Sequence, residues 1–249
     1  MKKQLTALMM AWGMFCAIPC PCKLWDEKSR GWMLVWFPVV GLLIGGVWAL
    51  AAFGLGLWGK TGLLSSCVLM ALPFLLTGFL HLDGFMDCCD AILSRRELAE
   101  RQRILKDSHV GSFAVICVSL LFLSELAAFY EMDWQKYALA LLPLPAAVRS
   151  AAALLVRYRK PMVTSQYAGR YEQEKTTAQG VWMAVLLAAF TVLPVLLLGK
   201  AGCACVLGVL GCGLSALLAS RNLGGMSGDI SGFSITLGEL CGIMYLTLL

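Results

Sequence analysis

Three aspartates in the stretch HLDGFMDCCDA (residues 81–91) have a spacing suited to metal and phosphate chemistry. Asp83, Asp87 and Asp90 follow one another at i, i+4 and i+7, so on a helix they share one face. Three neighbouring carboxylates repel one another unless a cation lies between them. Oxygen-only ligands in an open arrangement suit Mg²⁺, which also takes ligands from substrate phosphates. The pattern therefore predicts a Mg²⁺ site, and surface acids at a membrane boundary are the alternative.

His81 precedes this acidic face by two residues, which places it on roughly the opposite side of the same helix. An imidazole there is suited to accept a proton or to contact a phosphate. A lone histidine at a membrane interface is as often structural, so the residue type leaves both interpretations open.

The acidic stretch continues into the basic segment SRRELAERQRILKDS, residues 94–108. Its alternating charges are typical of a solvated amphipathic helix. Beside an acidic metal site, the same charges would also suit a phosphate-rich substrate or a lipid headgroup. At the end of the segment, Asp107 or Ser108 is expected to cap the first turn of the next helix.

A second polar segment, RNLGGMSGDISG, runs from Arg221 to Gly232. Glycine-rich turns that open a helix often receive phosphates at the helix N-terminus, and Asp229 stands where a span is expected to begin. Glycines also serve helix packing in membranes, so the pattern alone is weak. Its predicted position on the same side of the membrane as the aspartates strengthens the functional interpretation.

The composition shows which elements must position these residues. The chain has 249 residues, of which 59% are hydrophobic and 14% are charged, and its mean hydropathy is +0.78. This balance is typical of a polytopic membrane protein and predicts one all-α helix bundle, a single domain spanning 1–249. The formal net charge of +5 is too small to indicate nucleic acid as a partner.

About twenty apolar residues cross a bilayer, and this chain is expected to contain about seven such spans. The apolar runs are 33–58, 62–80, 109–130, 137–156, 180–199, 203–220 and 230–249. The first residues carry two lysines before an apolar stretch but show a poor cleavage pattern. We therefore expect a retained N-terminal helix that is interfacial or re-entrant.

With seven spans, the loops near 21–31, 81–108, 157–178 and 221–229 fall on one side of the membrane. These loops hold Lys23, Lys28, Arg30, Arg95, Arg96, Arg101, Arg103, Lys106, Arg157, Arg159, Lys160, Arg170, Lys175 and Arg221. The opposite side holds only Lys60, Lys136 and Lys200. Positive residues prefer the cytoplasm, so both polar segments are predicted to face it.

Four motifs together resemble the cobalamin synthase family, adenosylcobinamide-GDP ribazoletransferase, over nearly the full length. They are FPVVGLLIGG (37–46), HLDGFMDCCDA (81–91), KDSHVGSFAV (106–115) and GGMSGDISG (224–232). Three departures from the family pattern stand out. His109 occupies a usual arginine position, Cys88 and Cys89 replace small or hydroxyl residues, and Ser227 stands where threonine is common.

The resemblance implies a Mg²⁺-dependent enzyme of the bacterial inner membrane, with its active-site loops in the cytoplasm. It would transfer adenosylcobinamide phosphate from adenosylcobinamide-GDP to the 5′-hydroxyl of α-ribazole, or to α-ribazole 5′-phosphate, and release GMP. Asp83, Asp87, Asp90 and His81 are the implied catalytic residues. Substrate would contact Arg95, Arg96, Lys106, Asp107, Ser108, Arg221, Ser227, Gly228 and Asp229. The lipid bilayer is an expected partner, and a homo-oligomer or a complex with other cobalamin-assembly enzymes stays open.

Two other functions compete with this one. The first is another membrane phosphotransferase that uses a nucleotide-activated headgroup, although the usual CDP-alcohol pattern is not reproduced after Asp83-Gly84. The second is a small transporter, in which intramembrane acids carry ions. Glu125, Glu239 and Arg149 are the ionisable residues well inside the expected spans, and a Glu–Arg pair there would also simply hold helices together.

Overall fold

The computed structural model describes residues 2–163 and 176–249, and these residues form helices. The only β-type pairing within them is an isolated bridge between Pro161 and Met226. The all-α prediction is therefore confirmed. Arg170 and Lys175, from the expected loop 157–178, lie outside the described residues.

The helices are α1 (Lys2–Phe15), η1 (Glu27–Ser29), α2 (Arg30–Leu57), α3 (Leu63–Leu76), α4 (Leu80–Leu93), α5 (Leu98–Ile104), α6 (Ser112–Glu131), α7 (Trp134–Tyr137), η2 (Ala138–Leu141), α8 (Leu144–Tyr158), α9 (Thr177–Leu198), η4 (Gly199–Gly202), α10 (Cys203–Leu223) and α11 (Gly228–Thr247).

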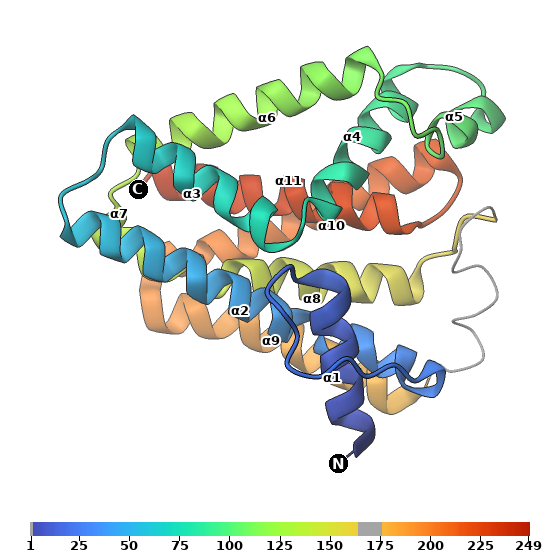
Figure 1. The fold of residues 1–249 in the computed structure, drawn as a ribbon, viewed down its shortest axis with the longest axis horizontal. Helices are drawn as coiled ribbons and strands as arrows, with labels where there is room; N and C mark the ends of the chain where they lie inside the picture. The colour runs from blue at the N-terminus through green and yellow to red at the C-terminus, as the bar shows by residue number, and fades with distance from the viewer. Residues whose placement is uncertain (1, 164–175) are drawn as a thin grey trace.

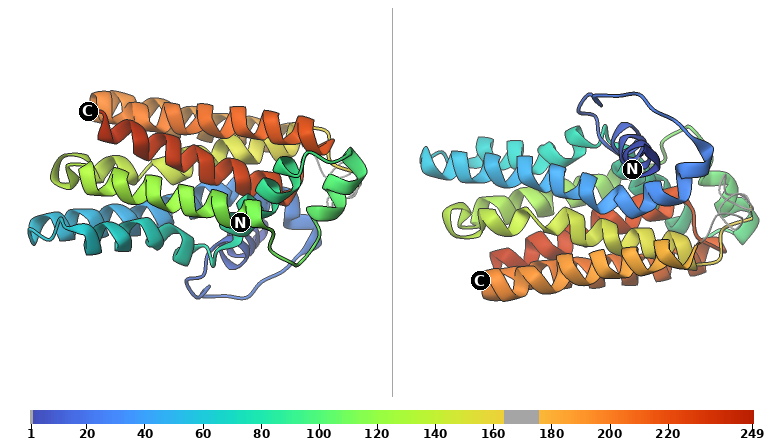
Figure 2. Two further views of the ribbon diagram at one scale, coloured as in Figure 1. Left: turned by 90° about the horizontal axis from the view of Figure 1, so that it is seen from above. Right: turned by 90° about the horizontal axis from the view of Figure 1, so that it is seen from below.

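The long helices run beside one another, whereas α1 lies across them and packs on α2 (Figures 1 and 2). Five helical stretches of the described chain have the length and apolarity of a membrane span, and the bent pair α3 and α4 would make a sixth. One of the five, Thr177–Leu223, folds back at η4 into two helices (Figure 1). The protein is thus membrane-embedded, and the number of seven spans stays a prediction.

A sharp bend separates α3 from α4, and the segment that follows it is helical rather than the loop that we expected. The two helices meet at 93°. Gly78 and Phe79 have φ values of 59° and 62°, left-handed conformations that end a right-handed helix. We expected a loop from 81 to 108, but this stretch contains α4 and α5. The acidic residues therefore lie on a helix that packs against α11 and α6.

The connecting segments gather at the two ends of the bundle. The α2–α3 connection, α7 and the C-terminus lie at one end, and α5 and the α10–α11 turn lie at the other (Figure 1). This arrangement agrees with the two groups of loops sorted from the charge pattern.

A buried ion pair joins α8 to α11 in the apolar interior. The guanidinium of Arg149 donates to the carboxylate of Glu239 and also, at 3.2 Å, to the carbonyl oxygen of Pro145. A buried charge is costly without a partner. Arg149 and Glu239 are two of the three ionisable side chains that suggested a transporter. Their pairing agrees with the alternative interpretation, in which a Glu–Arg pair holds two helices together.

Candidate active site

The two polar segments meet where α4 and α11 cross with their backbones in close contact. A Cβ atom added at Gly84 would lie 2.7 Å from the carbonyl oxygen of Asp229. One added at Gly232 would lie 3.0 Å from the carbonyl oxygen of His81. Only glycine permits this approach without displacing a helix. The crossing therefore explains why glycines accompany the charged residues in both motifs.

Three carboxylates gather beside this crossing. Asp83 and Asp87 come from α4 and Asp229 comes from the first turn of α11, and Asp87 lies close enough to the other two for their charges to repel. No ion pair involves any of these three carboxylates within the described parts of the chain. The Ser227 hydroxyl donates to Asp229 at 3.3 Å, and the charge of Lys106 acts on the same carboxylate. The predicted site residues of α4 and α11 are thus brought together.

A cavity of about 150 Å³ adjoins these acids, and its polar end includes His81, Asp83, Gly228, Asp229 and Ser231. His81 is buried, with its ring 6.0 Å from the ring of Phe37. Although His81 and Asp83 are two residues apart on α4, both line this cavity. His81 is buried and Asp83 is exposed, so the cavity reaches two different sides of the first turn of α4.

Asp90 has a different environment from the other two aspartates of α4. Its Oδ2 accepts from the backbone N–H of Gly111 at 2.7 Å, and its Oδ1 accepts from that of Ala114 at 3.0 Å. This buried carboxylate satisfies N–H groups at the start of α6 that have no partner within the helix. The expectation that Asp107 or Ser108 caps this helix was wrong, because α6 begins only at Ser112.

The donor set fits Mg²⁺ in its chemistry. Carboxylate oxygens are the ligands that Mg²⁺ prefers, and it is commonly held by one or two of them together with substrate phosphates and water. Asp83, Asp87 and Asp229 supply such oxygens. Within residues 2–163 and 176–249, no three His, Cys, Asp or Glu side chains are close enough to enclose a metal by themselves. The role of Asp90 as a ligand stays a prediction.

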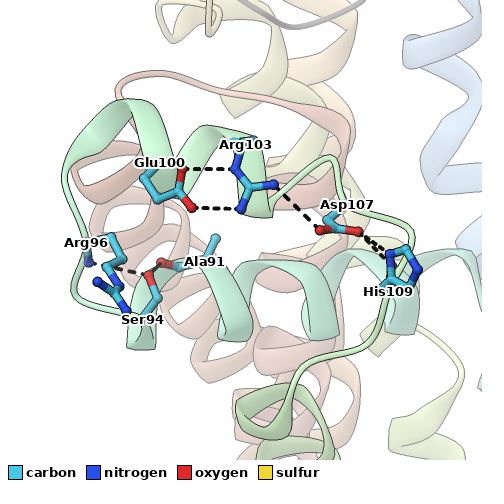
Figure 3. A network of polar contacts seen from close by, with 7 residues as sticks. All are labelled: Ala91, Ser94, Arg96, Glu100, Arg103, Asp107 and His109. Carbon is cyan, nitrogen blue, oxygen red and sulfur yellow. Dashed lines mark hydrogen bonds and ion pairs between the residues drawn. The ribbon is translucent and has the colours of Figure 1, made fainter.

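The basic segment forms its own polar network between α4 and α6 (Figure 3). Arg103 donates two hydrogen bonds to Glu100, at 2.8 and 2.9 Å, and lies 3.9 Å from Asp107. The His109 side chain and backbone N–H both bond to Asp107, and these bonds lower the pKa of that carboxyl. This part of the segment has the predicted character of a solvated charged helix.

Arg101 and Gln102 of α5, and the other predicted contact residues at this end of the bundle, have different surroundings. Arg101 donates to the side chain of Asn222 at 3.0 Å, and Gln102 donates to the carbonyl oxygen of Leu223 at 2.8 Å. These bonds fasten α5 to the end of α10. The remaining predicted contacts are exposed at this end of the bundle: Arg95, Arg96, Lys106, Ser108 and Arg221.

The α10–α11 turn is held from outside by the segment after α8. Met226 donates its N–H to the carbonyl oxygen of Lys160 at 2.8 Å, and Met162 donates to that of Met226 at 2.9 Å. Ser227 then caps α11 by accepting from the N–H of Ile230. The predicted helix start beside Asp229 is confirmed, and this rigid turn fixes the position of the carboxylate.

Sequence reasoning missed two kinds of residue in the cavity. Ser231 lies two positions after Asp229, within a motif already singled out, but its hydroxyl was not considered. Phe37 opens the FPVVGLLIGG motif and packs between His81 and the guanidinium of Arg149, whose centre is 5.8 Å from the ring. The position of Phe37 in a family motif could have indicated a role at the active site. A phenylalanine in an apolar run, however, is equally expected in the core of the bundle.

A membrane-embedded bundle with carboxylates at one cavity and exposed basic side chains at the same end has the features of a membrane transferase of phosphate groups. The family described as Cobalamin-5-phosphate synthase matches residues 7–247. The chain belongs to this family and is an enzyme of cobalamin synthesis.

Curated relatives resemble the chain over nearly its whole length. One from Clostridium botulinum (strain Alaska E43 / Type E3) is 36% identical and covers 98% of this chain and 97% of its own. One from Clostridium perfringens (strain 13 / Type A) is 32% identical and covers 99% of both chains. One from Halalkalibacterium halodurans is 33% identical, with 98% and 97% covered. All three are named adenosylcobinamide-GDP ribazoletransferase. No solved structure matches the chain.

Proposed function

We propose that this protein joins adenosylcobinamide-GDP to α-ribazole, or to α-ribazole 5′-phosphate, and releases GMP. A ribose hydroxyl attacks the phosphorus next to cobinamide, and the bond from that phosphorus to the bridging oxygen breaks. GMP leaves with the bridging oxygen, and the hydroxyl proton passes to a base. The product is adenosylcobalamin or its 5′-phosphate.

One detail of the expected reaction needs correction. We expected the 5′-hydroxyl of ribazole to attack, but the family is described as forming a cobalamin 5-phosphate. An acceptor that already carries a 5′-phosphate has no free 5′-hydroxyl. The attacking group is therefore another ribose hydroxyl.

The observation that carries this proposal is the α4–α11 crossing, which places Asp83, Asp229 and His81 on one cavity with Asp87 nearby. A pyrophosphate substrate brings negative charge, so a cluster of carboxylates can receive it only together with cations. The exposed side chain of Lys106 supplies positive charge whose field reaches Asp229. Arg95, Arg96 and Arg221 offer further positive charge to the nucleotide at the same end of the bundle.

Mg²⁺ would be held by one or two of the carboxylates of Asp83, Asp87 and Asp229 together with substrate phosphates, and its charge would stabilise the leaving GMP. Asp90 acts differently in this proposal, because its carboxylate holds the start of α6. His81 or one of the cavity carboxylates accepts the proton of the attacking hydroxyl. The buried position of His81, against Phe37, keeps its ring in a fixed place at the cavity wall.

The loops that carry this site face the cytoplasm of the bacterial cell, where both substrates are found in this proposal. The excess of Lys and Arg at this end of the bundle supports that orientation. An epitope inserted at Ser108 should be reached by antibody only after the cells are permeabilised, and one inserted at Lys60 should be reached in intact cells. The reverse pattern would overturn the orientation.

The activity is tested with purified protein in detergent, adenosylcobinamide-GDP and α-ribazole. GMP and the joined corrinoid product should form in equal amounts, only when both substrates are present, and only with Mg²⁺ rather than with excess chelator. Product formation unchanged by the chelator would overturn the metal assignment. No GMP release with either form of ribazole would overturn the proposed reaction and favour a transporter or another transferase.

A further inference from the structure

The cavity beside the carboxylates has a second, apolar half. Helices that are distant in sequence form its wall: Phe15 of α1, Leu34 and Phe37 of α2, and Ala153 and Val156 of α8. α1 lies across the bundle (Figure 1), and its Phe15 lines the cavity. Residues of α4 and α11 therefore give the cavity a charged part, and residues of α1, α2 and α8 give it an apolar part, which suits a small amphipathic molecule.

The size of the cavity limits which part of the substrates it admits. Its volume is about 150 Å³. A corrin ring with its peripheral amides is far larger and must stay outside. Three flat ring systems are small enough to enter: the guanine and the adenine of the nucleotide donor, and the base of the riboside acceptor.

The chemistry of the wall distinguishes the two purines of the donor from the base of the acceptor, as a comparison with guanine shows. Guanine presents several hydrogen-bond donors and acceptors on its edges, and burying them against apolar side chains without partners is unfavourable. A benzimidazole-type base has mostly C–H edges, so it loses little on entering an apolar cavity and gains contact area. The side chains of α1, α2 and α8 named above offer no hydrogen bond to a purine edge.

We propose that this apolar half binds the aromatic base of the riboside acceptor and selects benzimidazoles over purines. The inference rests on the proposed function and adds which substrate occupies the cavity. With the base inside, the attached ribose lies at the polar end, next to His81, Asp83 and Asp229. The attacking hydroxyl is then held beside the groups proposed to accept its proton, and the donor binds from outside.

The test narrows the cavity and measures each substrate separately. Ala153→Leu is expected to raise KM for the α-riboside of 5,6-dimethylbenzimidazole about tenfold, and less for the smaller benzimidazole riboside. KM for adenosylcobinamide-GDP should stay near the wild-type value. Ala184→Leu, on an exposed face of α9, is the matched control and should change neither constant. Val156→Phe is a second narrowing variant for the case that Ala153→Leu does not fold.

A polar variant tests the selection of the ring directly. Leu34→Asn should shift the ratio of kcat/KM from the benzimidazole riboside towards the adenine α-riboside, because the amide offers a partner to the purine edge. Calorimetric titration of each riboside, without the nucleotide donor, should show the same order of affinities.

The outcomes separate this inference from the proposed function. A rise in KM for adenosylcobinamide-GDP alone would mean that the cavity holds a purine of the donor, and the inference would be wrong. Unchanged constants for both substrates in folded narrowing variants would also overturn it, while wild-type turnover would still support the proposed function. Absence of wild-type turnover with every riboside would instead contradict the proposed function.

Discussion

Helices α4 and α5 come from neighbouring parts of one charged stretch, yet the crossing of α4 with α11 and the network around α5 hold their charges in different ways. At the crossing, Asp83, Asp87 and Asp229 stand together without an ion pair within the described residues. In the network, Glu100 and Arg103 neutralise each other through two hydrogen bonds, with side chains 42% and 65% exposed (Figure 3).

This difference shows where a ligand is to be expected. Exposed pairs spaced i, i+3 are stabilised weakly and are solvated by water whether or not a ligand is present. Carboxylates crowded at a helix crossing repel one another, and a cation relieves that repulsion. The crossing is therefore the region where we expect a cation to bind, whereas the network mainly shapes the connection between α4 and α6.

The largest effect is expected from Asp87→Asn, which keeps the side-chain shape and removes the charge. Turnover should fall about 100-fold or more, the scale at which loss of one preorganised contact to a transition state acts. Thermal stability should be unchanged or slightly higher, because one source of repulsion is removed. GMP release and thermal unfolding measure the two quantities.

Asp133→Asn is the matched control for that change. Asp133 caps α7 through the N–H of Lys136, far along the chain from the crossing, and Asn is an equally good cap. Its turnover should match the wild type. If Asp87→Asn behaved like this control, the crossing would not be the catalytic region.

Gly84→Ala should break the crossing itself. The added methyl group would lie 2.7 Å from a backbone oxygen of Asp229, so α4 and α11 must separate. We expect a loss of about 1–3 kcal/mol in the free energy of unfolding, and a fall in turnover of about tenfold from the displaced carboxylates.

Gly213→Ala provides the comparison, because a Cβ at that position of α10 has nothing within 4 Å. Alanine is the better helix former, so this variant should be as stable as the wild type or more so. Equal behaviour of the two variants would show that close packing at Gly84 has no special role.

Asp90→Ala separates a structural carboxylate from a metal ligand. The variant removes two hydrogen bonds to the start of α6, and we expect a loss of about 1–2 kcal/mol in stability. Turnover of the folded protein should fall much less than in Asp87→Asn. A collapse of turnover with unchanged thermal stability would instead support the prediction that Asp90 is a third Mg²⁺ ligand.

The smallest effect is expected in the α5 network. Glu100→Gln removes the charge that pairs with Arg103, but both side chains are exposed and solvated. Turnover should change by less than about twofold, and added salt should weaken even that effect. A loss of turnover comparable to that of Asp87→Asn would place the network in the catalytic region together with the crossing.

Much of this protein was predictable from local sequence. Apolar runs of membrane length predicted the helical bundle, because a backbone in lipid must satisfy its hydrogen bonds within helices. The spacing of Asp83 and Asp87 placed both on one face of a helix, and four motifs identified the family. The start of α11 beside Asp229 was also predictable, since glycines followed by an apolar run signal a helix start.

The tertiary structure alone decided how these parts combine. Helical spacing gives the face on which Asp90 lies but not what that face meets, and here it meets the N-terminus of α6. The bend at Gly78 and Phe79 lies inside an apolar run, so hydropathy could not reveal it. The meeting of Asp229 with Asp83 and Asp87 depends on a backbone contact between helices far apart in the chain. Sequence patterns report the periodicity of single helices, whereas such contacts depend on how whole helices pack, and that is why only the structure could assemble the site.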